Sequence, residues 1–296
     1  MKIVSIIIIM GFSLSGVLFA QENDAFLSDI QQIDETLTNA ASYYKDDDKL
    51  EANREVKTIL KSILKNPDSI DAPVDSLKRI SVLKSDDGKL RLFTWNLLFD
   101  DLTHTCYGFI QYQPKKDELL VYELKDFYIL RDSLERKYSS HAEWYGAIYY
   151  EIIEKSYKNS TVYTLLGWRG RNALTQQKIV ETLEFDRHNL PNFGKKRLRI
   201  GRSREMRLIS TYTIRTQMIL RFNEKQDIIV LDHLSPSDPK LIGYFEYYGS
   251  DYSYDAFEFD KGNWYFVSDI DPERAINYER DKEKESLKDR KPSSNF

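Results

Sequence analysis

The chain has 296 residues, with 43 Lys and Arg against 47 Asp and Glu, and its formal net charge at pH 7 is −4. A charge so near balance argues against nucleic acid as the partner, because nucleic-acid-binding proteins are typically basic. Hydrophobic residues make up 41% of the chain and only 12 Gly and 8 Pro occur, which excludes a low-complexity or disordered protein.

The first twenty residues predict export from the cytoplasm. Lys2 is followed by an almost wholly apolar run over 3–19, and Ala20 precedes polar residues that begin at Gln21. A charged start, an apolar segment and a small residue at the cut are the parts of a secretory signal peptide. We therefore expect residues 1–20 to be removed, leaving a periplasmic or secreted protein without a transmembrane helix.

Residues 21–70 are predicted to form a pair of helices. Apolar residues recur at helical spacing over 26–41 and again over 50–64. Asp46 to Asp48 are expected to cap the second helix and to interact favourably with its dipole, and Pro67 follows its end. Two such apolar faces cannot bury each other fully, so the pair is expected to pack on a following sheet.

Residues 71–272 are predicted to form a large antiparallel β region. From residue 77 the apolar period changes to alternation, and the 20 Tyr, 15 Phe and 4 Trp suit a pleated surface. Asp87-Gly88 lies between two alternating runs, which is a strong hairpin signal. About a dozen short strands favour antiparallel meanders over βαβ units. Beyond the first hairpin, the predicted strands span 105–112, 119–124, 145–153, 161–168, 178–185, 215–222, 227–231, 241–248, 254–259 and 264–267.

Two charged segments flank or divide this region. Residues 126–141 are helix-compatible and are predicted to connect two halves, if the region is subdivided. Residues 273–296 alternate in charge and hold few apolar residues, which predicts a frayed helix or a disordered tail. The fold class predicted is α+β and β-dominated, with an N-terminal helical pair on a sandwich, meander or propeller-like β region.

Four segments resemble uncharacterised exported proteins of Bacteroidota. They are DGKLRLFTW at 87–95, YTLLGW at 163–168, DHLSP at 232–236 and YGSDYSYD at 248–255. The resemblance covers most of the mature chain and implies an exported bacterial protein. It assigns no activity, and it favours the junction between Ala20 and Gln21 as the cleavage point.

A basic run over 195–207 is the sharpest local charge feature. Planar guanidinium groups bind carboxylate or phosphate through paired hydrogen bonds, so a cluster of them favours an anionic envelope glycan or lipid. The alternative is a solvated strand edge, since charged edges resist aggregation. The candidate ligand-binding residues are Arg197, Arg199, Arg202 and Arg204.

Three further residues have alternative interpretations. Trp168 lies at the end of a predicted strand, where it would offer a stacking surface for a sugar or would be partly buried core. Cys106 has no cysteine to pair with, and a buried apolar role is favoured over a nucleophilic one. His104 shares a strand face with Cys106, but a metal site needs three or four ligands, so we predict neither metal nor cofactor.

The sequence contains none of four common catalytic or phosphate-binding motifs. The chain holds no Gly-x-Ser-x-Gly, His-Glu-x-x-His, Cys-x-x-Cys or phosphate-loop pattern. Adjacent strand residues face opposite sides, so Asp232 and His233 are not expected to touch. The leading hypothesis is therefore a non-enzymatic binding or structural protein of the bacterial cell envelope, with an anionic polymer or a protein as partner. The alternative is an envelope-polymer hydrolase that uses His233 or the carboxylates of Asp251 and Asp255.

Overall fold

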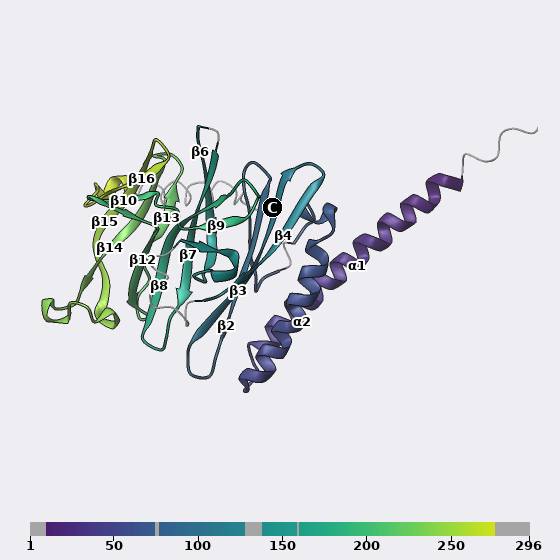
Figure 1. Ribbon diagram of the computed structural model, residues 1–296. Helices are drawn as coiled ribbons and strands as arrows, with labels where there is room; N and C mark the ends of the chain where they lie inside the picture. Colours follow the sequence, from purple (N-terminus) through teal and green to yellow (C-terminus); the bar gives the residue numbers. More distant parts are fainter. Residues whose placement is uncertain (1–9, 75–76, 128–137, 159, 276–296) are drawn as a thin grey trace, which may run out of the picture.

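The computed structural model describes residues 10–74, 77–127, 138–158 and 160–275. The described chain stacks two helices and three β-sheets face to face, and the layers follow one another from right to left in Figure 1. The predicted fold class is confirmed: the protein is β-dominated, its sheets are mainly antiparallel, and a helical pair precedes them. Among the three arrangements left open by the sequence, stacked sheets of the sandwich kind are observed.

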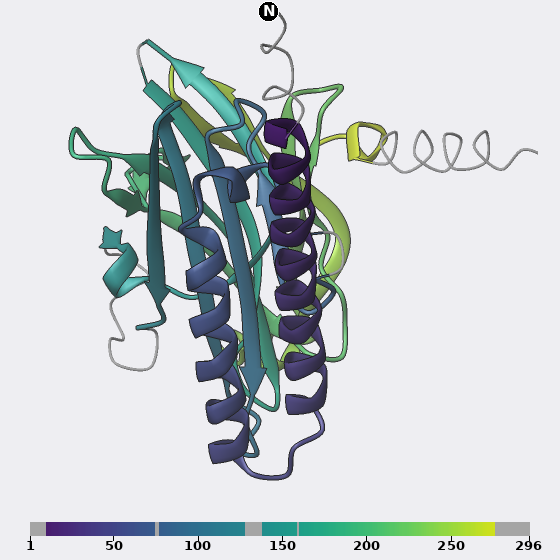
Figure 2. The same ribbon diagram turned by 90° about the vertical axis from the view of Figure 1, so that its right-hand side faces the viewer.

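Helices α1 (Met10–Ala40) and α2 (Asp46–Leu64) lie side by side over one face of the first sheet (Figure 2). Ile30 and Ile33 of α1 are fully buried with Val56 and Leu60 of α2, and this cluster continues into the sheet through Phe93. The apolar stripe of each helix therefore packs on the sheet, as the helical spacing in the sequence predicts.

Two details of the helical pair differ from or go beyond the predictions. The N-cap of α2 is Lys45, which makes no side-chain capping bond, whereas Asp46 to Asp48 lie in the first turn. Their carboxylates still lie near the positive end of the helix dipole. Helix α1 runs without interruption through Ala20, and its first turns project beyond the sheets (Figure 1). Residues 1–9 of the predicted signal peptide lie outside the described residues, so cleavage stays a prediction.

The first sheet has the order β1-β2-β3-β4, and all its neighbours are antiparallel. Along β2, Leu90 and Leu92 face the second sheet while Phe93 and Trp95 face the helices, so alternation divides the strand between two cores. The hairpin predicted at Asp87-Gly88 joins β1 to β2. The strands are β1 (Ser81–Lys84), β2 (Leu90–Leu98), β3 (His104–Lys115) and β4 (Glu118–Lys125).

The second sheet is the middle layer and is buried on both faces. Leu165 and Ile179 pack toward the first sheet, whereas Leu166 and Val180 pack toward the third. Its order is β5-β9-β8-β7-β6, with β12 also paired to β8. The strands are β5 (Ser139–Ser140), β6 (Ile148–Tyr157), β7 (Ser160–Gly170), β8 (Thr175–Phe185), β9 (Pro191–Phe193) and β12 (Arg207–Thr213).

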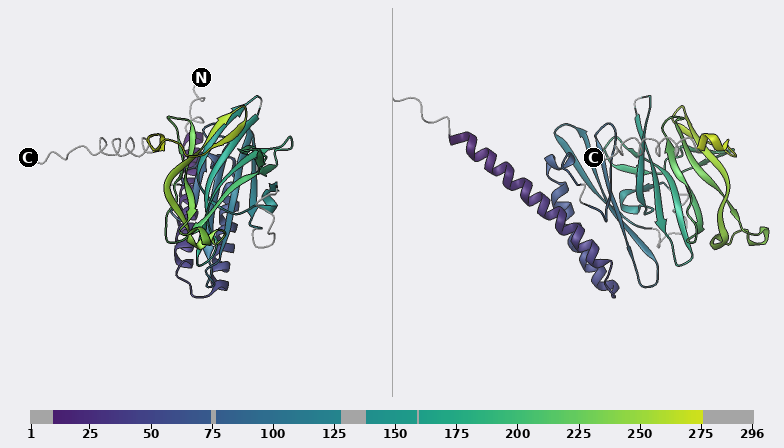
Figure 3. Two further views of the ribbon diagram at one scale, coloured as in Figure 1. Left: turned by 90° about the vertical axis from the view of Figure 1, so that its left-hand side faces the viewer. Right: turned by 180° about the vertical axis from the view of Figure 1, so that it is seen from behind.

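The third sheet closes the far side of the stack, as the view from behind in Figure 3 also shows. Its order is β11-β10-β16-β15-β14-β13, and β10 pairs with β16 in parallel. Ile270 and Ala275 pack on its outer face. The strands are β10 (Leu198–Ile200), β11 (Ser203–Glu205), β13 (Leu220–Asn223), β14 (Ile228–Pro236), β15 (Tyr248–Asp260) and β16 (Asn263–Val267).

Two predicted strands are wrong in whole or in part. The chain over 241–248 forms short 3₁₀ turns up to Tyr248, because Pro239 cannot donate a ladder hydrogen bond and Gly243 has a φ of +91°. The strand predicted over 215–222 begins only at Leu220. The short 3₁₀ helices are η1 (Pro67–Ile70), η4 (His141–Glu143), η5 (Pro239–Leu241) and η6 (Phe245–Tyr247).

The two charged segments of the prediction lie mostly outside the described residues. Most of the predicted connector (128–137) and most of the predicted tail (276–296) lie outside the described residues. Within the described part of the chain, no helix has both the length and the apolar content needed to cross a bilayer.

Candidate ligand-binding pocket

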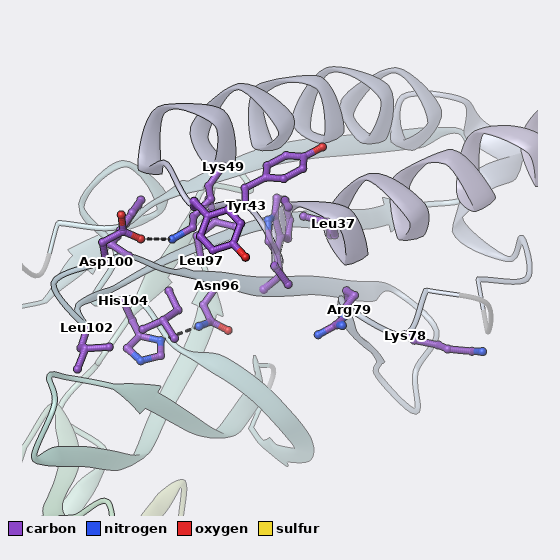
Figure 4. Close-up of a pocket in the computed structure, with 16 residues that line it drawn as sticks. Leu37, Tyr43, Lys49, Lys78, Arg79, Asn96, Leu97, Asp100, Leu102 and His104 are labelled. Carbon is purple, nitrogen blue, oxygen red and sulfur yellow. Dashed lines mark hydrogen bonds and ion pairs between the residues drawn. The ribbon is translucent and has the colours of Figure 1, made fainter.

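A pocket of about 880 Å³ opens between the α1–α2 connection and the end of the β2–β3 hairpin (Figure 4). This size lies within the roughly 300–1,000 Å³ of small-molecule sites. Ten of its sixteen lining residues are aliphatic or aromatic. They are Leu37, Ala40, Ala41, Tyr43, Tyr44, Trp95, Leu97, Leu98, Phe99 and Leu102.

Trp95 forms the floor of the pocket. Trp95 is 1% exposed, and its indole N–H donates to Asn53 Oδ1 on α2 at 2.7 Å. Its ring stacks against Tyr107 and Phe109, with centroids 5.9 and 6.1 Å away. The hydrogen bond joins α2 to the first sheet beneath the pocket, and the aromatic contacts join β2 to β3 within that sheet.

The rim is apolar and open to solvent. Tyr44 is 94% exposed, and Tyr43, Leu98 and Leu102 are also exposed. The backbone of Leu102 has a φ of +62° in the hairpin turn, which leaves its side chain at the pocket edge. Exposed apolar side chains that surround a hollow are typical of a binding site rather than of ordinary surface.

Lys49 stabilises one wall. Its ammonium lies 2.7 Å from Asp100 and 3.0 Å from Asp46, and these hydrogen bonds raise its pKa. The carboxylate of Asp46 also accepts the backbone N–H of Asp100. This cation therefore holds the start of α2 against the hairpin and is not available to a ligand.

Lys78 and Arg79 provide the free positive charge of the pocket. Asp34 on α1 accepts both of their backbone N–H groups, at 2.7 and 3.2 Å, so the position of this segment is fixed. Both side chains are exposed, and neither forms an ion pair with any residue that the structure describes. In Figure 4 they extend along the side of the pocket opposite Asp100.

The inner wall carries a neutral imidazole. Burial, and secondarily the charge of Arg169, lowers the pKa of His104, and the Asn96 amide nitrogen lies 2.7 Å from its Nδ1. The ring lies so close to Gly170 that a Cβ there would be 2.4 Å from its Nε2. Trp168 contacts the same ring edge-on, with centroids 5.7 Å apart. The predicted stacking residue thus supports the wall from behind and does not line the pocket.

The structure places the arginines of the basic run in different surroundings, although Arg199 and Arg204 lie opposite each other on β10 and β11. Arg197 pairs with Glu184, and Arg199 donates to Asn263 Oδ1 at 2.8 Å. Arg202 and Arg204 are exposed on the β10–β11 hairpin. None of the four lines the large pocket.

His233 and Asp255 do come together, through a β-bulge between β14 and β15. His233 Nδ1 lies 2.9 Å from Asp255 Oδ2, and this contact raises the pKa of the imidazole. Asp232 accepts the backbone N–H of Ile219 and forms no hydrogen bond or ion pair with His233, as the sequence predicts. Neither His233 nor Asp255 lines the large pocket or the three smaller pockets of about 210 to 380 Å³.

Cys106 is a buried core residue. It is 1% exposed, and burial raises the pKa of its thiol to about 12. The thiol therefore stays protonated and is unsuited to nucleophilic attack. Among the described residues, no three His, Cys, Asp or Glu side chains are placed to hold a metal ion.

Comparison of the chain with protein-family models, with curated proteins and with solved structures finds no match. The pocket therefore has to be interpreted from its own residues. Sequence reasoning missed them because the helical pair, the segment before β1 and the β2–β3 hairpin meet only in the folded chain. The local signals were weak: a Tyr43-Tyr44 pair between two helical stripes and a Lys78-Arg79 pair before the first strand.

Proposed function

We propose that the protein is a non-catalytic binding protein of the bacterial cell envelope, and that its ligand is an anionic amphiphile such as a single-chain phospholipid. One observation carries the proposal: Lys78 and Arg79 lie beside an otherwise mainly apolar pocket and form no ion pair with a described residue. The anionic headgroup pairs with these two cations, and the acyl chain lies along the tyrosine and leucine side chains of the rim.

The apolar rim and the two cations of the pocket contribute to the binding of such a ligand in different ways. Each CH₂ group removed from water contributes about 0.8 kcal/mol, so an acyl chain gains most of its affinity from the apolar rim. Guanidinium and ammonium groups form charge-assisted hydrogen bonds with phosphate and thereby favour an anionic headgroup over a neutral one. The location in the envelope rests on the signal-peptide pattern of residues 1–20.

A titration with defined lipids tests the proposal. Lysophosphatidylglycerol, below its micelle concentration, is expected to bind more tightly than zwitterionic lysophosphatidylcholine. A double variant, Lys78→Gln with Arg79→Gln, should lose about tenfold or more in affinity, because two charge-assisted contacts disappear. The matched control is Arg202→Gln with Arg204→Gln, which changes charge equally but outside the pocket.

The outcomes separate the alternatives. If the control loses affinity while the pocket variant does not, the ligand is bound by the basic run and the pocket proposal is wrong. If an acidic oligogalacturonate binds and the lipid does not, the ligand class is a glycan and the lipid assignment is wrong.

A hydrolase is the second candidate, and the His233–Asp255 contact is the observation in its favour. A carboxylate that orients an imidazole is part of many general-base arrangements. Release of soluble fragments from peptidoglycan by the purified protein, abolished by His233→Ala, would support this candidate. The binding proposal predicts no release by either protein.

A further inference from the structure

A second pocket, of about 380 Å³, lies where the first two sheets meet the segment that leads into β10. Five stretches of chain contribute to it: the β1–β2 turn, β3, the start of β7, the end of β8, and residues 195–197. Its lining is polar and differs from that of the large pocket. The side chains that matter for the argument are Lys89, Tyr112, Thr161, Glu184, Lys195 and Arg197.

A buried carboxylate holds two of the three cations in place. Glu184 accepts from Arg197 Nε at 2.9 Å, from Arg197 Nη2 at 2.7 Å and from Lys195 Nζ at 3.1 Å. The Glu184 side chain is only 3% exposed, whereas Arg197 is 22% and Lys195 37% exposed. The carboxylate therefore lies beneath the cations, and the open side of the cluster is positive.

Several donors in this pocket are uncommitted. Lys89 Nζ lies 3.8 Å from Asp87, beyond hydrogen-bond distance, and Lys195 uses one of the three donors of its ammonium group. The hydroxyls of Tyr112 and Thr161 make no hydrogen bond to any residue that the structure describes. The pocket thus offers cationic donors on one side and neutral hydroxyls on the other.

The charges of the lining favour an anion. Three cations, Lys89, Lys195 and Arg197, line the pocket with one carboxylate, Glu184, and Asp87 lies 3.8 Å from Lys89 outside the lining. A carboxylate is an anion that lysine ammonium groups bind through charge-assisted hydrogen bonds. The hydroxyls suit a ligand that carries hydroxyl groups of its own.

We infer that this pocket is a second binding site, for a sugar ring that bears one carboxylate. The carboxylate of the sugar contacts Lys89 and Lys195, and its ring hydroxyls exchange hydrogen bonds with Tyr112 and Thr161. Of the predicted ligand-binding arginines, Arg197 belongs to this site, where it works with Glu184 to position Lys195. The site is separate from the lipid pocket and does not depend on the function proposed for it.

Calorimetric titration with D-glucuronate tests the inference, with D-glucose and inorganic phosphate as comparison ligands. Lys89→Gln leaves the Glu184 ion pairs intact and should weaken glucuronate binding about tenfold. Tyr112→Phe removes only a hydroxyl and should weaken glucuronate and leave phosphate unchanged. The matched control is Lys84→Gln, which removes the same charge from β1 outside the pocket and should bind as the unaltered protein does.

Three results would overturn the inference. The first is an absence of saturable glucuronate binding to the unaltered protein. The second is an equal loss of affinity in Lys84→Gln and Lys89→Gln, which would indicate general charge attraction. The third is tighter binding of phosphate than of glucuronate, which would assign the site to a simple anion.

Discussion

At the scale of single residues, a fully buried ion pair lies between the first and second sheets. Arg207 Nε donates to Glu181 Oε2 at 3.0 Å, and both side chains are 0% exposed. The hydroxyl of Tyr149 donates to the other oxygen of Glu181, and the Trp144 indole donates to that hydroxyl at 2.8 Å. The core between these two sheets therefore contains a polar network whose members form hydrogen bonds with one another.

Removing one partner of this pair should be costly. Arg207→Met leaves Glu181 as an uncompensated buried charge, so we expect a loss of about 3–5 kcal/mol in the free energy of unfolding. Urea denaturation of the variant and the unaltered protein measures this loss. The double variant Arg207→Met with Glu181→Gln removes the stranded charge and should recover part of the loss. A double variant as unstable as the single one would show that packing, not charge, accounts for the effect.

His233 should make stability depend on pH. Asp255 raises the pKa of the imidazole above its ordinary 6.5, so the contact stabilises the folded state below that value and is lost as pH rises through the folded-state pKa. The side chain is 48% exposed, which limits the contribution to about 1 kcal/mol or less. His233→Gln should therefore destabilise the protein at about pH 5 and not at about pH 9. Thermal denaturation at both pH values measures this difference. If the contact were absent, His233→Gln would change the midpoint equally at the two pH values.

At the scale of secondary-structure elements, the helical pair depends on its apolar stripe. Leu60 is fully buried against the first sheet, so Leu60→Ala should cost about 2–5 kcal/mol. Leu27→Ala is the matched control, because Leu27 is 50% exposed on the other helix and should change stability by about 0.5 kcal/mol or less. Equal losses in the two variants would mean that α1 and α2 do not pack as described.

The same scale shows what sequence patterns can and cannot predict. Alternation and Asp87-Gly88 were enough for the first hairpin, because the turn needs φ > 0 at Gly88 and the core needs one face of each strand. The run over 241–248 is rich in Tyr and Phe, which predicts a strand, but it forms short 3₁₀ turns up to Tyr248. Its conformation is decided by Pro239 and Gly243, not by its aromatic content.

At the scale of the whole molecule, the layers explain why the binding residues were hard to predict. Asp34 on α1 fixes the backbone of Lys78 and Arg79, and Lys49 on α2 fixes Asp100 in the hairpin, yet no sequence period connects these positions. The basic run is predicted as a site because its charges are adjacent in sequence. Folding assigns Arg197 and Lys195 to Glu184 and Arg207 to Glu181, and it leaves Arg202 and Arg204 at a sheet edge.

Hydrogen–deuterium exchange with and without lysophosphatidylglycerol tests the lipid-binding proposal most directly, because it reports where the ligand binds without altering the protein. The account predicts slower exchange over the α1–α2 connection and the β2–β3 hairpin, around residues 40–49 and 96–104, when the lipid is present. Protection confined to the basic hairpin of β10 and β11, or to the strands around His233, would contradict it.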